Sequence, residues 1–181
     1  MPNLETARLI LRPFVQSDLD ALAEIFGDHR VMRYLPAGQG ISRERTQVAL
    51  SRYIESWETR GHGLNAVIEK TNQKLIGHCG LVRLEYTEEI ELAYGYAHSH
   101  WGQGYATEAA RATVAFGFDL LGLKQIVAIV VPENTASQRV LEKLGMQYVR
   151  QASFYNLNVR YFRLTQAEYR HHSLDGEGQT I

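Results

Sequence analysis

The sequence predicts a single α/β domain, of the α+β kind, built on one mixed and mostly antiparallel sheet of about seven strands with helices on both faces. Three observations support this fold class. Three successive extended runs between residues 64 and 97 favour antiparallel hairpins. After residue 101 helical and strand patterns alternate, which favours strand–helix–strand crossovers. The chain has 181 residues, 45% hydrophobic and 22% charged, which is ordinary for one globular domain.

The first third of the chain is expected to supply one strand and two helices. Residues 7–14, "ARLILRPF", are short, apolar and branched, as in a strand. Ser17 is expected to cap a helix whose apolar positions recur at helical spacing up to Gly27. A second helix is expected from Ser42 to about residue 60. The glycine- and proline-containing stretch 28–41 between them is predicted to be an irregular loop of the kind that carries function.

The rest of the chain is expected to form the sheet and two further helices. Strands are predicted over 64–70, 74–84, 88–97 and 124–131, and a last hairpin over 147–155 and 158–165. One helix should run from 107 to Gly122, and another should be capped by Asn134 and end at Gly145. We therefore expect a domain over residues 1–170 and a flexible tail over residues 171–181.

Composition excludes several classes of protein. The formal net charge is −1 and the pI is about 6.7, which gives no broad positive field for a nucleic-acid partner. Cys79 is the single cysteine, so an intramolecular disulfide is excluded. No apolar run approaches the ~18 residues of a membrane span, and the first residues lack the layout of a signal peptide. We expect a cytoplasmic protein with no membrane partner, and the sequence leaves a homodimer open.

The stretch "WGQGYATEA", residues 101–109, places two glycines directly before a helix. No lysine follows Gly104, which excludes a Walker phosphate loop, and Thr107 stands where a dinucleotide fingerprint has its third glycine. A plain turn is one interpretation. The other is an anion site made by the free amides of residues 102–107 and the helix dipole. Thr107 and a second polar helix start at Asn134 and Ser137 favour the anion site.

Three blocks of the chain together resemble the GCN5-related N-acetyltransferase (GNAT) superfamily, and within it the ribosomal-protein-alanine N-acetyltransferase (RimJ/RimL-like) type. They are "LETARLILRPF", "IELAYGYAHSHWGQGYATEA" and "VPENTASQRVLEKLGM", and the similarity runs from Leu4 to about Leu164. The resemblance implies an acetyl-CoA-dependent acyltransferase without a metal, which transfers acetyl directly to a primary amine. A protein N-terminal α-amino group is the favoured acceptor. The alternatives are a small-molecule amine acetyltransferase and a non-catalytic acyl-CoA-binding module.

The resemblance also implies a binding site for acetyl-CoA. The pyrophosphate would lie on the turn, and the pantetheine arm would enter between two splayed central strands, one of them residues 94–97. Trp101 stands where the family pattern opens with Gln or Arg, so the backbone amides must carry more of the anion binding. The implied cofactor-binding residues are Tyr94, Gly95, Tyr96, Gly102, Gln103, Gly104, Tyr105, Ala106, Thr107, Asn134 and Ser137.

Two side chains are the candidates for proton transfer. Glu91 matches the family position of a base acting through water, and a solvent-facing strand carboxylate is the alternative. Many members have a tyrosine acid where this chain has Leu141, and in the ribosomal-protein subgroup the proposed acid matches Ser137, whose alternative role is a hydrogen bond in the first helical turn. Backbone near residues 94–96 is expected to stabilise the oxyanion, and Cys79 is expected to be a packed core thiol. The acceptor side is expected at residues 28–41 and 154–158.

Overall fold

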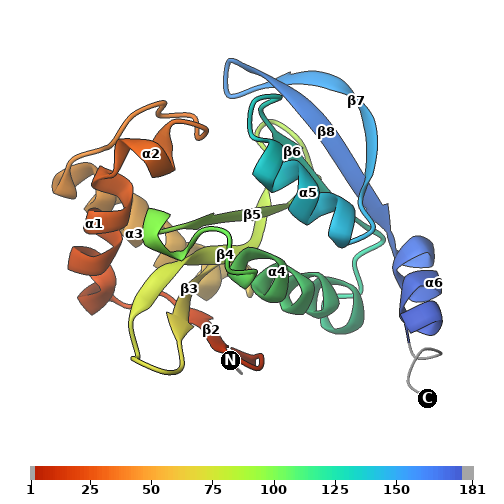
Figure 1. Cartoon of the computed structure of the whole chain (residues 1–181), viewed down its shortest axis with the longest axis horizontal. Coiled ribbons are helices and arrows are strands. Elements are labelled where there is room, and N and C mark those ends of the chain that lie inside the picture. Colours follow the sequence, from red (N-terminus) through yellow and green to blue (C-terminus); the bar gives the residue numbers. More distant parts are fainter. Residues whose placement is uncertain (1–2, 177–181) are drawn as a thin grey trace.

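One eight-stranded sheet organises the protein, in the order β1-β2-β3-β4-β5-β6-β8-β7, as seen in the computed structural model, which describes residues 3–176 (Figure 1). The predicted fold class is confirmed. The strands are β1 Leu4–Glu5, β2 Leu9–Pro13, β3 Leu64–Glu69, β4 Leu75–Arg83, β5 Ile90–Tyr96, β6 Gln125–Val130, β7 Gln147–Phe154 and β8 Leu157–Thr165. The helices are η1 Gln16–Asp18, α1 Leu19–Gly27, α2 His29–Met32, α3 Arg43–Arg60, η2 His98–His100, α4 Tyr105–Ala115, the π-helical turn η3 Phe116–Leu120, α5 Thr135–Lys143 and α6 Gln166–Gly176.

The sheet opens between its two central strands. All neighbouring strands pair antiparallel except β5 and β6, which are parallel. These two strands share a single paired register, Glu91 with Val127, and then separate toward the end of β5. The expected splay of the central strands is therefore present, and it leaves an unpaired backbone edge in the interior of the sheet.

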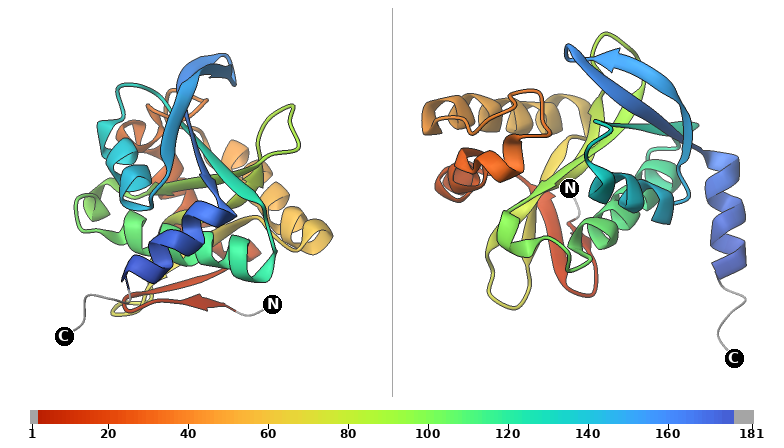
Figure 2. Two further views of the ribbon diagram at one scale, coloured as in Figure 1. Left: turned by 90° about the vertical axis from the view of Figure 1, so that its right-hand side faces the viewer. Right: turned by 45° about the horizontal axis from the view of Figure 1, so that its top comes forward.

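Helices cover both faces of the sheet, as the alternation of apolar residues requires (Figure 2). On one face α4 and α5 pack on a core that includes Leu9, Val114 and Phe162. On the other face α1 and α3 enclose a second core around Leu22 and Leu50. The site described below lies where the open edge of β5 meets α4 and α5.

Several helix ends follow the local sequence. The Ser42 hydroxyl accepts a hydrogen bond from the Arg45 N–H at 3.4 Å, and α3 is capped at its C-terminus by Gly61, with φ of 72°. The prediction for Ser17 is wrong: this residue lies inside η1, and α1 begins at Leu19 without a side-chain cap. The carboxylate of Asp18, the residue before α1, accepts hydrogen bonds from the Val15 N–H at 2.9 Å and from both terminal nitrogens of Arg12.

Three segments differ from the sequence-based expectation. The stretch 28–41 is irregular except for the short helix α2, capped by the Asp28 carboxylate. The helix expected to run to Gly122 ends at Ala115 and continues as the π-helical turn η3. Within η3 the backbone of Gly117 packs closely on β6, since a Cβ there would lie 2.8 Å from Ile126 Cδ1. Residues 171–176 of the expected flexible tail belong to α6, whereas residues 177–181 lie outside the described part of the chain. Among the described residues, no helix is long and apolar enough to cross a bilayer.

Candidate active site

The glycine turn before α4 exposes a row of backbone donors. Gly102 and Gly104 have φ of 73° and 83°, the left-handed conformation that glycine adopts without strain. Within residues 3–176, the N–H groups of residues 102–107 find no hydrogen-bond acceptor, whereas the Gly104 carbonyl accepts the Glu108 N–H at 3.1 Å. Free N–H donors next to the positive end of a helix dipole are the chemistry of an anion site.

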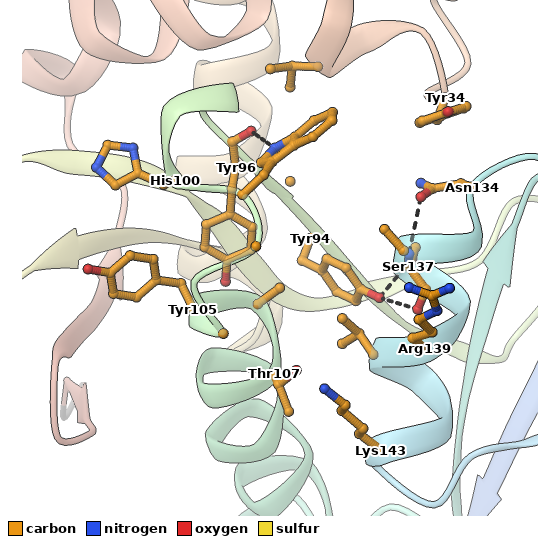
Figure 3. A pocket seen from close by; sticks show the side chains of 18 of the residues that line it. Tyr34, Tyr94, Tyr96, His100, Tyr105, Thr107, Asn134, Ser137, Arg139 and Lys143 are labelled. Atoms are coloured by element: carbon orange, nitrogen blue, oxygen red, sulfur yellow. Dashed lines mark hydrogen bonds between the residues drawn. The ribbon is translucent and has the colours of Figure 1, made fainter.

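A cavity of about 300 Å³ extends from this turn along β5 and α5 (Figure 3). Its walls contain every predicted cofactor-binding residue except Gln103, whose amide Nε2 donates to Ser99 O at 2.9 Å. Figure 3 shows Thr107 on α4 facing Lys143 on α5 across the cavity. Lys143 and Arg139 give this wall positive charge, which suits an anionic ligand. The lining residues are Val31, Tyr34, Leu35, Tyr94, Gly95, Tyr96, His100, Trp101, Gly102, Gly104, Tyr105, Ala106, Thr107, Asn134, Ala136, Ser137, Arg139, Val140 and Lys143.

The open edge of β5 supplies a further donor to this cavity. The Ala97 N–H donates to Ile76 O in β4 at 2.8 Å, so the N–H and C=O of the preceding Tyr96 point toward the opposite edge. The indole N–H of Trp101 donates to the Tyr96 carbonyl at 2.8 Å, which is consistent with that direction. Because β6 has already separated here, the Tyr96 N–H faces the gap between the strands.

Two hydroxyl groups meet on the cavity wall between β5 and α5. The Tyr94 and Ser137 hydroxyl oxygens are 2.8 Å apart, and the Tyr94 hydroxyl is also 3.2 Å from the Ser137 carbonyl. The Asn134 side chain accepts from the Ser137 N–H at 3.1 Å, which caps α5 as predicted. Burial raises the pKa of Tyr94 well above its usual value, so this hydroxyl keeps its proton and remains a donor. Leu141 is 1% exposed and packs in the core on the α4 side of the sheet.

Glu91 lies on the face of β5 opposite to Tyr94 and is 7% exposed. Burial raises its pKa to about 8, and no described residue forms a hydrogen bond or ion pair with its carboxyl group. The pKa of Tyr155 is raised mainly by burial and secondly by the charge of Glu91, so the turn between β7 and β8 lies within electrostatic range of Glu91. Glu91 is not among the residues that line the 300 Å³ cavity. The neighbouring Glu89 is engaged differently: its Oε1 accepts from the Tyr161 hydroxyl at 2.6 Å and from Gln125 Nε2 at 3.0 Å.

Two titratable side chains of β4, Cys79 and His78, lie in the packed core. Cys79 is buried with its Sγ 3.4 Å from Thr113 Oγ1, and burial raises its thiol pKa to about 12. His78 is also buried, which lowers its pKa to about 4 and keeps it neutral. A Cβ on Gly95 would lie 2.7 Å from the His78 ring, so the neighbouring imidazole explains this glycine. The described residues contain no group of three or more ligands able to hold a metal ion.

Sequence reasoning missed three features of the site. It treated Tyr94 as backbone only, because a contact with Ser137, 43 residues away, leaves no local signal. It assigned residues 28–41 to the acceptor side, whereas Tyr34 and Leu35 also reach the cavity wall. It did not identify Arg8, whose side chain contacts the glycine turn from the first hairpin.

A family model described as "Acetyltransferase (GNAT) domain" matches residues 8–147, which include the turn, β5 and α5. The chain belongs to the GNAT acetyltransferase family. It is therefore an acyltransferase that uses acetyl-CoA, and the amide-lined turn fits the anionic part of that cosubstrate.

Relatives and solved structures agree with this assignment. A Bacillus subtilis protein named "Uncharacterized N-acetyltransferase YoaA" is 34% identical over 148 residues, which is 81% of this GNAT acetyltransferase and 83% of the relative. A GNAT-family acetyltransferase from Bacillus anthracis is 28% identical with a TM-score of 0.78, covering 92% of this chain and 99% of that one. An acetyltransferase from Agrobacterium tumefaciens is 27% identical with a TM-score of 0.80, covering 91% and 94%.

Proposed function

We propose that this GNAT acetyltransferase is of the RimJ/RimL-like type and transfers acetyl from acetyl-CoA directly to a protein N-terminal α-amino group in a ternary complex. The observation that carries the proposal is the continuity of the cavity. It begins at the free amides of the turn, follows the open edge of β5 and reaches the Ser137–Tyr94 pair. The free amides would bind the diphosphate of acetyl-CoA, and the Ser137–Tyr94 pair would lie at its thioester.

The turn and the two helices would hold the cosubstrate. The amides of residues 102–107 and the hydroxyl of Thr107 would bind the pyrophosphate, and Asn134 would lie beside the arm that follows it. Lys143 and Arg139 would add positive charge along α5. The positive φ of Gly104 supports this assignment, because a side chain there would strain the backbone that presents the amides.

The open edge of β5 would supply the two groups that acyl transfer needs from the protein. The Tyr96 N–H points into the gap between β5 and β6, where it would stabilise the oxyanion that forms on the acetyl carbonyl. The Ser137 hydroxyl would donate a proton to the departing thiolate and regain one from solvent, and the Tyr94 hydroxyl at 2.8 Å would orient it by hydrogen bonding while keeping its own proton.

Glu91 would accept the proton of the amine through water, because the carboxyl group does not reach the cavity wall. Its pKa of about 8 supports an α-amino acceptor, since a free α-amino group titrates near ~8 and a lysine near ~10.4. Proton transfer from an α-amine to Glu91 is then almost thermoneutral, whereas transfer from a lysine would be uphill by about 3 kcal/mol. The Tyr155 turn, close to Glu91, would form part of the acceptor side.

Structures with the same fold act on both protein and small-molecule amines. A ribosomal-protein-S5-alanine acetyltransferase from Vibrio fischeri has a TM-score of 0.74 at 17% identity. A spermidine N-acetyltransferase from Vibrio cholerae, solved with CoA and spermine, has a TM-score of 0.76 at 20% identity. The fold alone is therefore compatible with either acceptor, and a small-molecule amine is the competing assignment.

An acceptor screen tests the proposal. Release of free thiol from acetyl-CoA is measured over peptides with free Ala, Ser or Met N-termini, over the same peptides with blocked N-termini and an internal lysine, and over spermidine. We expect kcat/KM for at least one free N-terminus to exceed those of the lysine peptides and spermidine by tenfold or more. Turnover confined to spermidine or lysine would assign a different acceptor, and absence of turnover on every amine would contradict the proposed chemistry.

A further inference from the structure

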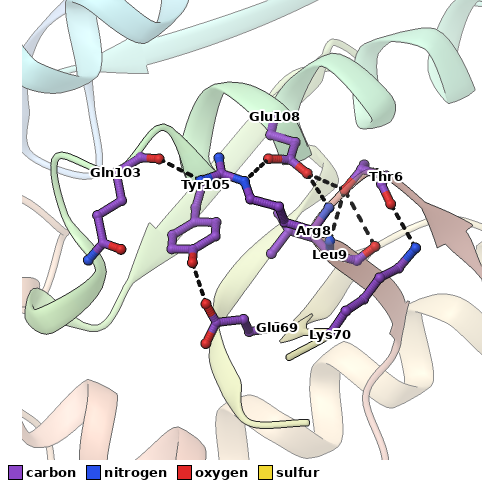
Figure 4. Close-up of polar contacts among 8 residues, drawn as sticks. All are labelled: Thr6, Arg8, Leu9, Glu69, Lys70, Gln103, Tyr105 and Glu108. Carbon is purple, nitrogen blue, oxygen red and sulfur yellow. Dashed lines mark hydrogen bonds and ion pairs between the residues drawn. The ribbon is translucent and has the colours of Figure 1, made fainter. Parts of the chain in front are cut away.

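Arg8 lies in the hairpin formed by β1 and β2, here called the first hairpin, and contacts the glycine turn, which lies 95 positions later in the chain (Figure 4). Its Nη1 donates to the Gln103 carbonyl at 3.0 Å, and its Nε donates to Glu108 Oε2 at 2.7 Å. The guanidinium carbon lies 4.3 Å from the centroid of the Tyr105 ring, and Nη2 lies 3.4 Å from the position of a Cβ on Gly104. One side chain thus contacts the turn, the first residue of α4 and a carboxylate in its first turn.

We propose that Arg8 is a positioning residue for acetyl-CoA: it fixes the orientation of the turn amides and shields the cosubstrate phosphates from the Glu108 carboxylate. The inference rests on the proposed binding of the pyrophosphate at residues 102–107. It adds a residue that does not line the 300 Å³ cavity. Arg8 lines the adjoining hollow, which shares Gly104, Thr107 and Lys143 with that cavity, and it contacts the turn through the Gln103 peptide.

The hydrogen bond from Arg8 restrains the peptide unit between Gln103 and Gly104. In a trans peptide the carbonyl and the following N–H point in opposite directions. The hydrogen bond from Arg8 holds the Gln103 carbonyl toward the first hairpin, so the Gly104 N–H of the same peptide is held away from it. This constraint matters because glycines on both sides of Gln103 leave the peptide otherwise free to rotate.

Arg8 also balances the negative charge of Glu108. Glu108 lies in the first turn of α4, where a carboxylate is stabilised by the helix dipole but repels a bound phosphate. Its Oε1 accepts from the Thr6 hydroxyl at 2.6 Å and from the Arg8 N–H at 2.8 Å, and its Oε2 faces the Arg8 guanidinium. The carboxylate is therefore occupied on the hairpin side, and the positive charge of Arg8 lies between it and the turn.

The Tyr105 ring lies beneath the Arg8 guanidinium. Tyr105 is 7% exposed, its hydroxyl donates to the Glu69 carboxylate, and the Arg8 guanidinium carbon lies over its ring, 4.3 Å from the centroid. Arginine can stack on this ring and bond in two directions within one plane, whereas the ammonium of a lysine cannot make all three contacts at once. The site therefore favours arginine over a simple positive charge.

The experiment compares Arg8→Gln and Arg8→Lys with the wild-type protein, using acetyl-CoA and S-acetylpantetheine as donors and the best acceptor from the screen. Arg43→Gln is the matched control, because Arg43 is about as exposed as Arg8 and makes an ion pair of the same 2.7 Å length, with Asp20, between α1 and α3. For Arg8→Gln we expect a roughly tenfold rise in the KM for acetyl-CoA and in the Kd for CoA measured by calorimetry. The kcat should change less than twofold, and Arg8→Lys should recover only part of the loss.

S-Acetylpantetheine separates positioning from folding. This donor has no phosphate, so Arg8→Gln should leave its kcat/KM within twofold of wild type, as should Arg43→Gln with either donor. An equal loss on both donors, or unchanged acetyl-CoA affinity together with a lower melting temperature, would overturn the inference and leave Arg8 as a purely structural residue. Failure of the wild-type protein to bind CoA would instead refute the proposed phosphate site.

Discussion

Replacing Glu91 by glutamine should make the protein more stable and slower at the same time. The carboxyl group is 7% exposed and lacks a hydrogen-bonding partner, and burial raises its pKa from 4.5 to about 8. The folded state therefore binds a proton that the unfolded state releases between these two values. A group with a raised pKa contributes its full stability below pH 4.5 and loses it as the pH rises toward 8.

The size of the effect follows from the same two pKa values. Each pKa unit corresponds to about 1.4 kcal/mol, so folding with this carboxyl group costs about 3 kcal/mol more at pH 8 than at pH 5. Glutamine has nearly the same shape and no charge to desolvate. The gain in the free energy of unfolding caused by Glu91→Gln should accordingly be below about 1 kcal/mol at pH 5 and about 3 to 4 kcal/mol at pH 8.

Urea denaturation of the wild type and of Glu91→Gln at pH 5 and pH 8 measures this difference directly. Glu24→Gln, on the exposed side of α1, is the matched control and should change stability by less than about 0.5 kcal/mol at both pH values. An equal effect of Glu91→Gln at the two pH values would refute the reasoning from burial. If Glu91 is also the base, kcat should fall roughly 100-fold, and the wild-type kcat should rise with pH toward 8. A variant that is more stable but fully active would remove Glu91 from the mechanism.

The remaining predictions concern the turn and the hydroxyl pair. Gly104→Glu should abolish measurable CoA binding by calorimetry, because it adds a carboxylate and strains a backbone with φ of 83°; unchanged affinity would show that the turn is not the phosphate site. Ser137→Ala should lower kcat by roughly tenfold or more with little change in the KM for acetyl-CoA, since the hydroxyl acts on the leaving thiolate. Tyr94→Phe should lower kcat less, and the double variant should resemble Ser137→Ala, because the two groups act as one unit. Additive losses would assign the two hydroxyls independent roles.

Local sequence patterns predicted the architecture of the sheet well because its strands and helices have clear periodicities. The caps at Ser42 and Asn134 were also readable, since a cap involves residues only three positions apart. The two-residue strand β1 and the single-turn helix α2 were not, because segments this short are held by their neighbours and carry no period of their own. The π-helical turn depends on how closely Gly117 approaches β4 and β6, which is a property of the packed structure.

The same distinction applies to the candidate site. The glycine turn is a local motif, and the structure gives it the free amides that the sequence suggested. The Tyr94–Ser137 and Arg8–Gln103 contacts join residues 43 and 95 positions apart, so they appear only once the chain has folded. The burial of Glu91 was equally unreadable, because strand alternation gives its face but not what covers that face.

The opening between β5 and β6 also bears on the solubility of the protein. Unpaired strand edges attract other chains, and both outer edges of this sheet are blunted: β1 has only two residues, and β7 has a register shift between Tyr148 and Arg150. A further stretch of unpaired strand backbone, in β5 beyond Glu91, lies in the middle of the sheet, flanked by helices. A neighbouring polypeptide has no straight approach to it, whereas a thin flexible ligand does. The unpaired N–H and C=O groups of β5 can therefore bind a small molecule without pairing with a strand of another chain.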